Sequence, residues 1–331
     1  MGYAQEHTTN RAKANDICTD SCGQPDMPNI KRMHGYIGVI DLSFNEPVCA
    51  IGDFDYRVHS LKKVSVVRHA KDDEKLNVIT KSLLDTLKES NIDKSKMKII
   101  IISHPGIIGN NNTYQYVNKR HHALTQIGLK QYLQKYFNIP IFLENNAKLA
   151  AMGEMHFGMD VEIKDLIYVS CGIGLSSGII SNGKLYNGGK RAAGEIGSFL
   201  DCDNRRIEDV VALEGLTSYI EGIFAIAGKS TKLSFSDIVN LARKEDELAL
   251  KGIYDIGKKM GRVIYNCSIM LDIPTVIVGG DYLQLGHMLF DGIDASISDG
   301  LLYRPKVIRS ILRESASVYG CFIMGKNKVW G

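Results

Sequence analysis

Ile141-Phe-Leu-Glu144-Asn145-Asn146-Ala-Lys-Leu-Ala-Ala-Met-Gly-Glu154 is the stretch that decides the fold. An apolar run ends in a polar Glu-Asn-Asn triplet, and an alanine-rich helical segment follows. A second apolar run, residues 165–171, breaks into a glycine and serine turn at residues 172–178. Glycines let a backbone bend tightly and bring its N–H groups close to an anion. This order predicts a strand, a polar site, a helix, a second strand and a phosphate-sized loop, although an ordinary hairpin would carry similar glycines.

A third block, Ala193-Gly-Glu-Ile-Gly-Ser198, follows an Asn182-Gly183 turn. The three motifs together resemble the ROK family (repressors, open reading frames, kinases). Its members carry Glu-Asn-Asp-Ala-Asn-Ala, then a glycine-rich phosphate loop, then Ala-Gly-Glu-Ile-Gly-His. The resemblance covers roughly residue 36 to the C-terminus. It implies an α/β protein with the two-lobed actin-like ATPase (ribonuclease H-like) fold of the sugar kinases, with a ligand cleft between the lobes.

The domain organisation expected on this basis has three parts. Residues 1–34 form a flexible tail or linker remnant, because they hold few large apolar residues and carry Gly23, Pro25 and Pro28 as breakers. Residues 35–142 form an N-terminal α/β lobe, joined by a C-terminal helix at about residues 305–331, and residues 143–304 form the C-terminal lobe. A helix-turn-helix needs three helical segments, which do not fit in the tail. We therefore expect no direct DNA binding by this chain as given.

Composition narrows the class of protein. The 331 residues are 44% hydrophobic and 23% charged, which is typical of a soluble globular protein. The net charge of +3 is too small to indicate a nucleic-acid or membrane partner, and no apolar run approaches the roughly 20 residues of a membrane span. Seven scattered cysteines suit reduced thiols. We expect a cytoplasmic protein, and the resemblance adds a homodimer.

Hydrophobic periodicity predicts the main elements. Strands are expected at residues 36–42, 47–54 and 58–68, followed by a helix whose apolar face carries Leu76, Ile79, Leu83 and Leu87, and then a buried strand at 99–102. Later helices are expected at 125–137, 253–271 and 309–324, with a buried strand that starts at Pro274 and runs into a Gly279-Gly280 turn. The alternation of strands and helices favours an α/β fold.

The chemistry depends on Asn146. In the family's kinases, the aspartate at this place is the general base that takes the proton from the sugar hydroxyl. An amide can hydrogen-bond a hydroxyl but cannot accept its proton near neutral pH. Loss of a general base costs roughly 10²–10⁴-fold in rate. The resemblance therefore implies that no catalytic residue is intact, while sugar binding remains possible.

The resemblance also implies a sugar-binding set, namely Asn145, Asn146, Glu195, Ser198 in place of the family's histidine, and Glu214. The last of these matches the end of the family's Cys-Leu-Glu motif, although a solvated helix glutamate is an equal alternative. The family's zinc loop is reduced here to Cys202, with no histidine. Because a structural zinc site needs four ligands, we predict no zinc or other metal site.

The nucleotide site is expected to be vestigial. The family's first hairpin carries Asp-x-Gly-x-Thr, whereas this chain has Gly38-Val-Ile-Asp-Leu-Ser-Phe-Asn45. Either Ile40 stands at the aspartate position, or Ser43 and Asn45 replace glycine and threonine. The predicted remnants are Asp41, Ser43, the loop residues Gly172, Gly174 and Gly178, and the adenine-end turn Gly279-Gly280. A plain strand-to-loop turn would explain the last pair equally well.

The expected function is a ROK-type sugar-binding sensor, related to the transcriptional regulators, with a decayed kinase site and no certain cofactor. The alternative is an ATP-dependent sugar kinase acting on a hexose or N-acetylhexosamine. That enzyme would need MgATP, Asp41 near the metal and another carboxylate as base. A scaffold that binds neither ligand is a third possibility. Motifs do not identify the sugar, because hydroxyl stereochemistry is read by geometry.

Overall fold

The computed structural model describes residues 35–43, 46–65, 71–116, 128–159, 162–229, 231–297 and 302–330. Some of the predictions lie outside the described residues. These are the expected tail at residues 1–34, Asn45, residues 66–68 of the third expected strand, and residues 125–127 of the helix expected at 125–137.

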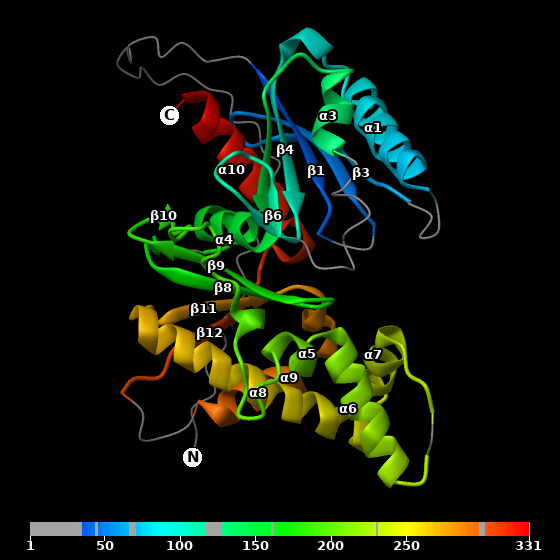
Figure 1. Cartoon of the computed structure of the whole chain (residues 1–331), viewed down its shortest axis with the longest axis vertical. Helices are drawn as coiled ribbons and strands as arrows, with labels where there is room; N and C mark the ends of the chain where they lie inside the picture. The colour runs from blue at the N-terminus through cyan, green and yellow to red at the C-terminus, as the bar shows by residue number, and fades with distance from the viewer. Residues whose placement is uncertain are drawn as a thin grey trace, which may run out of the picture. The chain divides into compact units, whose positions relative to one another are not determined.

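The first sheet has five strands in the order β3-β2-β1-β4-β7 (Figure 1). Its strands are β1 (Tyr36–Asp41), β2 (Val48–Asp53), β3 (Val58–Lys63), β4 (Met97–His104) and β7 (Ile141–Asn145). The first three form the predicted antiparallel meander, whereas β4 and β7 run parallel to β1. Parallel strands end at the same edge of a sheet, so Asp41, His104 and Asn145 come to one edge.

Each face of this sheet is covered by helices. Alternate side chains of β1 and β4, such as Ile40 and Ile102, pack against α1 (Asp72–Glu89), and α3 (Leu129–Gln134) joins the same core. The opposite side chains, such as Val39, pack against Phe322 of α10 (Ala316–Trp330). Short elements complete this part: η1 (Lys94–Lys96), β5 (Ile107–Ile108) and β6 (Tyr114–Tyr116).

The second sheet has the order β10-β9-β8-β11-β12. Its strands are β8 (Leu166–Cys171), β9 (Leu175–Ser181), β10 (Lys184–Leu185), β11 (Thr275–Gly279) and β12 (Lys306–Arg309). Around it lie η3 (Ile196–Ser198), α5 (Ile207–Val211), α6 (Leu213–Ile226), α7 (Phe235–Arg243), α8 (Glu247–Leu271), η4 (Asp281–Leu285), α9 (His287–Ser296) and η5 (Arg313–Ser315). The long helix α8 forms much of the core on one face, as the apolar spacing predicted.

Helix α4 (Asn146–Phe157) connects the two sheets and packs against α10. The two helices approach at glycines. A Cβ on Gly153 would lie 2.1 Å from the Ala316 carbonyl oxygen, and one on Gly320 would lie 1.9 Å from that of Leu149. Any larger residue would push the helices apart. This close contact fixes the start of α4, where the polar triplet lies.

Several predicted boundaries differ from the structure. The helix expected at 125–137 ends at Gln134, and the helix expected at 253–271 begins earlier, at Glu247. The strand expected at 58–68 ends at Lys63. The final helix was expected at 309–324 but begins at Ala316, because residues 306–309 pair with β11 as strand β12. The expected lobe boundary after residue 142 falls inside β7, whose five residues all pair with β4 in the first sheet. The division into lobes stays a prediction in its exact limits.

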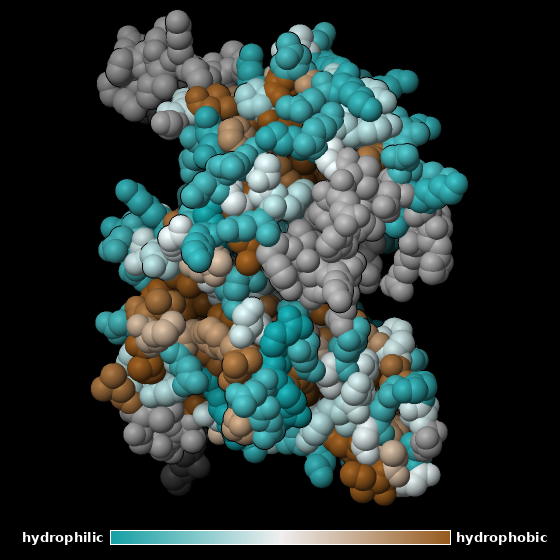
Figure 2. Space-filling model, viewed as in Figure 1, coloured by the Kyte–Doolittle hydropathy of each residue, from teal (hydrophilic) through white to brown (hydrophobic). Residues whose placement is uncertain are grey.

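The surface carries some exposed apolar side chains. In Figure 2 they gather over β11, β12 and the nearby end of α8. Met270 is 71% exposed and Leu302 82%. The homodimer stays a prediction, since nothing here shows what would cover these side chains. No helix in the described part of the chain is both long enough and apolar enough to cross a membrane.

Candidate functional site

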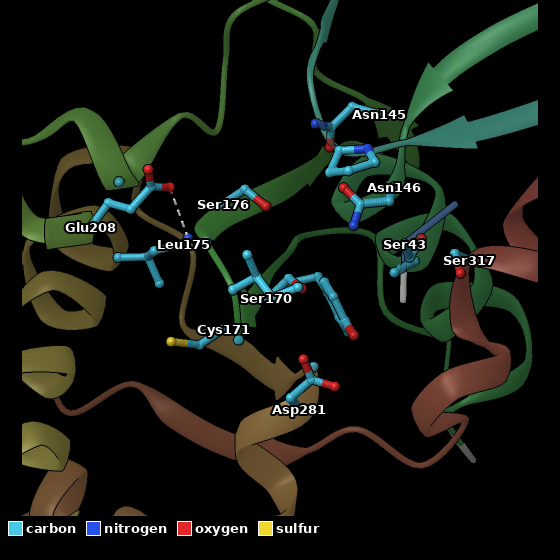
Figure 3. Close-up of a pocket in the computed structure, with 18 of the residues that line it drawn as sticks. Ser43, Asn145, Asn146, Ser170, Cys171, Leu175, Ser176, Glu208, Asp281 and Ser317 are labelled. Atoms are coloured by element: carbon cyan, nitrogen blue, oxygen red, sulfur yellow. Dashed lines mark hydrogen bonds between the residues drawn. The ribbon is translucent and has the colours of Figure 1, made fainter. Parts of the chain in front are cut away.

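A pocket opens where the two sheets meet, at the start of α4. Its walls come from the first sheet's edge, the β8–β9 turn, the segment that follows Glu195, and η4 (Figure 3). The space within it is about 1080 Å³ with open solvent at its mouth included. The lining residues predicted from sequence are Ser43, Asn145, Asn146, Gly172, Gly174, Glu195, Ser198 and Gly280.

Asn145 ends β7 and caps α4. Its Oδ1 accepts hydrogen bonds from the Ala147 and Lys148 N–H groups at 2.9 and 3.2 Å, and its Nδ2 donates to the Gly106 carbonyl at 3.1 Å. An asparagine at this place satisfies two N–H groups that a helix start leaves without partners. Much of its hydrogen-bonding capacity therefore serves the fold, and only part of it remains for a ligand.

Asn146 is the first residue of α4 and reaches into the pocket (Figure 3). Its buried Oδ1 has no hydrogen-bond partner among the described residues. A buried polar atom without a partner is costly and marks a place where a ligand or water can bind. The side-chain amide offers one acceptor and two donors, which match sugar hydroxyls. It offers no base.

Glu195 lines the pocket at the N-cap of η3. The preceding residue is held to β9, because the Gly194 carbonyl accepts hydrogen bonds from both the backbone N–H and the Oγ of Ser177. Burial raises the pKa of the Glu195 carboxyl, nearby Lys148 lowers it, and nearby Glu208 raises it further. Ser198, at the end of the same turn, is exposed.

Glu208 was not predicted, yet it lines the pocket from α5. Its Oε2 accepts a hydrogen bond from the Leu175 N–H at 3.1 Å, shown as the dashed line in Figure 3. Leu175 lies within the predicted phosphate loop. The Gly172 N–H is also used, since it donates to the Gly174 carbonyl at 3.0 Å. Two N–H groups of the predicted phosphate loop are therefore already bonded within the protein.

Asp281 is a second unpredicted carboxylate at this loop. It begins η4 directly after the Gly279-Gly280 turn and lines the pocket (Figure 3). A Cβ on Gly172 would lie 2.6 Å from Asp281 Oδ2, so the carboxylate rests against the glycine turn. Burial, followed by the charge of Glu314, raises the pKa of Asp281.

Asp41 lies behind the pocket wall. The residue is fully buried, and its carboxylate accepts hydrogen bonds from the Ser43 N–H at 3.0 Å and from the hydroxyls of Ser43 and Ser317. Burial raises the pKa of Asp41, and these hydrogen bonds partly offset the rise. Ser43 and Ser317 face the pocket instead.

Three other predicted residues are not among those that line the pocket. Gly178 lies inside β9 under α4, where a Cβ would be 2.3 Å from the Ala147 carbonyl oxygen. Gly279 ends β11 against the Tyr168 hydroxyl, which a Cβ would approach to 2.0 Å. Both glycines permit close packing. Glu214 lies in the first turn of α6. Their ligand roles stay predictions without support from the pocket.

The region of the family's zinc loop is held by an ion pair. Asp201 accepts hydrogen bonds from the backbone N–H groups of Asp203 and Arg205, both at 2.9 Å, and from the Arg205 guanidinium. In the described part of the chain, no three His, Cys, Asp or Glu side chains are placed to hold a metal ion. The turn leads into α5 and hence to Glu208.

A family model for the ROK family matches residues 40–328 of this sequence. The chain belongs to the ROK family. The match covers most of the chain and confirms the resemblance drawn from the three motifs.

Among ROK relatives, the chain is similar to a xylose repressor of Caldicellulosiruptor bescii, with 28% identity over 219 residues. That alignment covers 60% of this chain and 55% of the repressor, so the chain matches about half of that relative's length. It is also similar to a glucokinase of Halalkalibacterium halodurans, with 27% identity over 243 residues, 65% of this chain and 72% of the glucokinase. Repressors and kinases are thus both among its relatives.

The ROK fold is confirmed by solved structures. A ROK family glucokinase from Streptomyces griseus, in complex with glucose and AMPPNP, superposes with a TM-score of 0.71 at 21% identity. The superposition covers 88% of this chain and all of the other. This chain therefore has the two-lobed actin-like fold expected from the sequence.

Sequence reasoning missed the carboxylates Glu208 and Asp281. Asp281 had a local signal, because it is the first polar residue after a buried strand and a double-glycine turn. Glu208 had none, because its place depends on α5 folding back onto β9 over 33 residues of chain. Arg206 and Arg313, which also line the pocket, were missed for the same reason.

Proposed function

We propose that this chain is a sugar-binding sensor of the ROK family that lacks a working phosphotransfer centre. The observation that carries the proposal is Asn146. Its amide stands in the pocket at the family's general-base position, with a buried oxygen that has no partner among the described residues. Such a group can hold a sugar hydroxyl but cannot take its proton.

The other pocket walls support sugar recognition. Glu195 supplies a carboxylate acceptor, and Asn145 supplies what remains of its amide beside Asn146. Carboxylates and amides converging on one pocket suit a neutral polyol, because each hydroxyl both donates and accepts a hydrogen bond. Ser198, Glu214 and the remaining predicted residues have no contact that adds to this argument.

The predicted phosphate loop lies beside acidic side chains. Glu208 accepts a hydrogen bond from the Leu175 N–H, and the Asp281 carboxylate rests against Gly172. Arg206, whose guanidinium lies 3.9 Å from Glu208, offsets part of this negative charge. Asp41, the expected partner of the metal, is fully buried and bonded to serines, which supports a nucleotide site without working phosphotransfer.

The regulatory side of the proposal rests on the relatives. A sugar that bound both walls of the pocket would favour the closed arrangement of the lobes, and that population shift would be the signal. Because the chain matches about half the length of the xylose repressor, the DNA-binding activity of a repressor is not assigned to it. Its place in the cell is proposed to be the cytoplasm.

The test is thermal melting of the full chain against D-xylose, D-glucose, other hexoses, N-acetylhexosamines and their 6-phosphates, each with and without MgATP. A ligand that binds the folded state raises the melting temperature by mass action. We expect one sugar to act alone, with no added effect of MgATP and no ADP released. Sugar-dependent ADP release would overturn the proposal.

Glu195→Ala tests whether the same pocket is responsible. Loss of a hydrogen bond to a charged group is worth about 1.5–3 kcal/mol, so the sugar affinity should fall by roughly tenfold to a hundredfold. Glu162→Ala is the matched control, because its side chain is 83% exposed. Equal sugar affinity in wild type and Glu195→Ala would remove the assigned site.

The second candidate function is the ATP-dependent sugar kinase. The glucokinase relative favours it, together with Glu195, a carboxylate in the same pocket whose pKa is raised toward that of a useful base. Under this reading MgATP would raise the melting temperature further and ADP would accumulate, so the same assay separates the two functions.

A further inference from the structure

Lys148 is a buried lysine two residues into α4. The residue is 1% exposed, which is rare for lysine, and the ROK motif has asparagine at this place. Burying an ammonium group is costly unless hydrogen bonds and opposite charges compensate. The partners of Lys148 therefore indicate what the lysine does.

Both direct partners of the ammonium belong to one turn, residues 187–191. Lys148 Nζ donates to the Arg191 carbonyl at 2.6 Å and to Asn187 Oδ1 at 3.4 Å. The turn is tight, with left-handed backbone at Gly188 (φ 71°) and Arg191 (φ 57°). Arginine is disfavoured in this conformation, so the contacts around it must hold the backbone in place.

Arg191 extends the same connection to the first sheet. Its guanidinium pairs with Glu144 at the end of β7, and its Nε donates to the Ile108 carbonyl at 2.9 Å. The 187–191 turn follows β10 of the second sheet. Lys148 and Arg191 together therefore join α4, the edge of the first sheet and this turn.

Glu195 follows two anchored segments of the chain. Lys148 and Arg191 hold residues 187–191. Gly194, directly before Glu195, is bonded to Ser177 of β9, and a Cβ on Gly194 would lie only 2.0 Å from the Ser177 carbonyl oxygen. The position of the Glu195 carboxylate in the pocket depends on both.

Lys148 and Glu195 each have charged neighbours of both signs. The charged groups that act on Lys148 are Glu144 from β7, and Arg191 and Glu195 from the loop. Those that act on Glu195 are Lys148 from α4 and Glu208 from α5. Lys148 is thus the positive neighbour of Glu195, and Glu208 is its negative neighbour.

We propose that Lys148 is a positioning residue of the sugar site: its buried ammonium clamps the 187–191 turn to α4 and thereby sets the place of Glu195 in the pocket. The inference rests on the proposed function, in which Glu195 accepts hydrogen bonds from sugar hydroxyls. It goes beyond that function by assigning a role to a side chain that does not line the pocket.

The charge effect has a definite sign. Lys148 lowers the pKa of Glu195 against the rise caused by burial and by Glu208. Without the ammonium, the pKa of Glu195 rises and more of the carboxyl is protonated at mildly acidic pH. A protonated carboxyl is a poorer acceptor, so sugar affinity would then fall as the pH is lowered.

The experiment follows the titration of Glu195 in the ligand-free full chain by carboxyl-carbon NMR, with Glu195→Gln to assign the signal. The variants are Lys148→Met, which removes the charge, and Lys148→Asn, the residue in the family motif. Lys164→Met is the control, because Lys164 is 66% exposed. We expect the Glu195 midpoint to rise in both Lys148 variants and not in the control, because the opposite charge that lowers it is lost.

Two further readouts separate positioning from packing. Amide hydrogen exchange of residues 187–191 should speed up in both Lys148 variants, because the turn loses its clamp. As the solution is acidified, affinity for the sugar identified by melting should fall at a higher pH in the variants than in wild type. An unchanged midpoint and unchanged exchange in a folded Lys148→Asn variant would overturn the inference. A shifted midpoint with no sugar bound by wild type would instead reject the proposed function alone.

Discussion

The ion pair between Arg191 and Glu144 offers the sharpest test of how the sugar side of the pocket is held together. The exposed fractions of the two side chains are 22% and 3%. Glu144 Oε1 also accepts a hydrogen bond from the Asn145 N–H at 2.8 Å, directly at the cap of α4. Replacing Arg191 with alanine would leave this buried carboxylate without its guanidinium.

The magnitude follows from what remains around Glu144. Breaking a buried ion pair by removing one partner costs about 3–5 kcal/mol. The Asn145 N–H still bonds Glu144, Lys148 is close enough to act on it, and Arg191 is itself 22% exposed, so the cost falls to the bottom of that range or slightly below it. We expect Arg191→Ala to lower the free energy of unfolding by about 2–3 kcal/mol. The left-handed backbone at residue 191 is equally unfavourable for both residues and cancels.

The assay is denaturant unfolding followed by circular dichroism and by fluorescence of the single tryptophan. Trp330 packs on Phe54, with ring centroids 5.6 Å apart, so its fluorescence reports on the first sheet. Coincident transitions are needed before one unfolding free energy is quoted. Glu144→Gln and the double variant complete a cycle, with an expected coupling energy of about 1–3 kcal/mol.

Two results would refute this reasoning. The first is an unfolding free energy of Arg191→Ala within about 0.5 kcal/mol of wild type, which is the range of a neutral surface change. The second is a coupling energy near zero in the double-mutant cycle. It would mean that the two side chains act separately and that Arg191 does not join the 187–191 turn to the first sheet.

Three further predictions concern other parts of the site. Asn146→Asp restores a carboxylate at the general-base position but should release no ADP with sugar and MgATP, and sustained turnover in a coupled assay would show that the phosphate loop works. Gly178→Ala should cost about 1–3 kcal/mol, because its Cβ would lie 2.3 Å from the Ala147 carbonyl oxygen, while Gly189→Ala, with no atom within 4 Å, should melt like wild type. Burial raises the pKa of Glu154 above its unfolded value of 4.5, so wild type loses stability as the pH rises from the unfolded pKa to the folded pKa. Glu154→Gln removes this loss, so the stability of the variant relative to wild type should increase from pH 4 to pH 7 in denaturant titrations. A constant difference in stability would contradict this prediction.

Local sequence patterns gave the secondary structure well where the pattern was long. The helix with Leu76, Ile79 and Leu83 on one face is α1, and those side chains are 0–1% exposed in the first core. The end of the chain was less well predicted. Residues 306–309 form a strand because they pair with β11, which is a contact between distant segments that periodicity does not contain.

The motifs placed part of the site. Asn145, Asn146 and Glu195 were predicted from sequence and line one pocket, because β7 ends at Asn145 and the residue before Glu195 is bonded to Ser177 of β9. Gly178 and Gly279 were assigned to the nucleotide from the same motifs, but they lie where backbone or an aromatic ring packs closely. A glycine in a motif indicates that there is no room for a side chain at that position, and only the tertiary structure shows which atoms take up the room.

The sequence alone predicted the family, the two-lobed fold and an amide at residue 146, because each depends on motifs whose residues lie close together along the chain. Tertiary structure decided which charges meet. Glu208 reaches Leu175, Asp281 rests on Gly172, and Lys148 bonds the turn before Glu195. These contacts join segments 33 to more than 100 residues apart, and electrostatic energy depends on distance in space and on burial, neither of which the order of residues specifies.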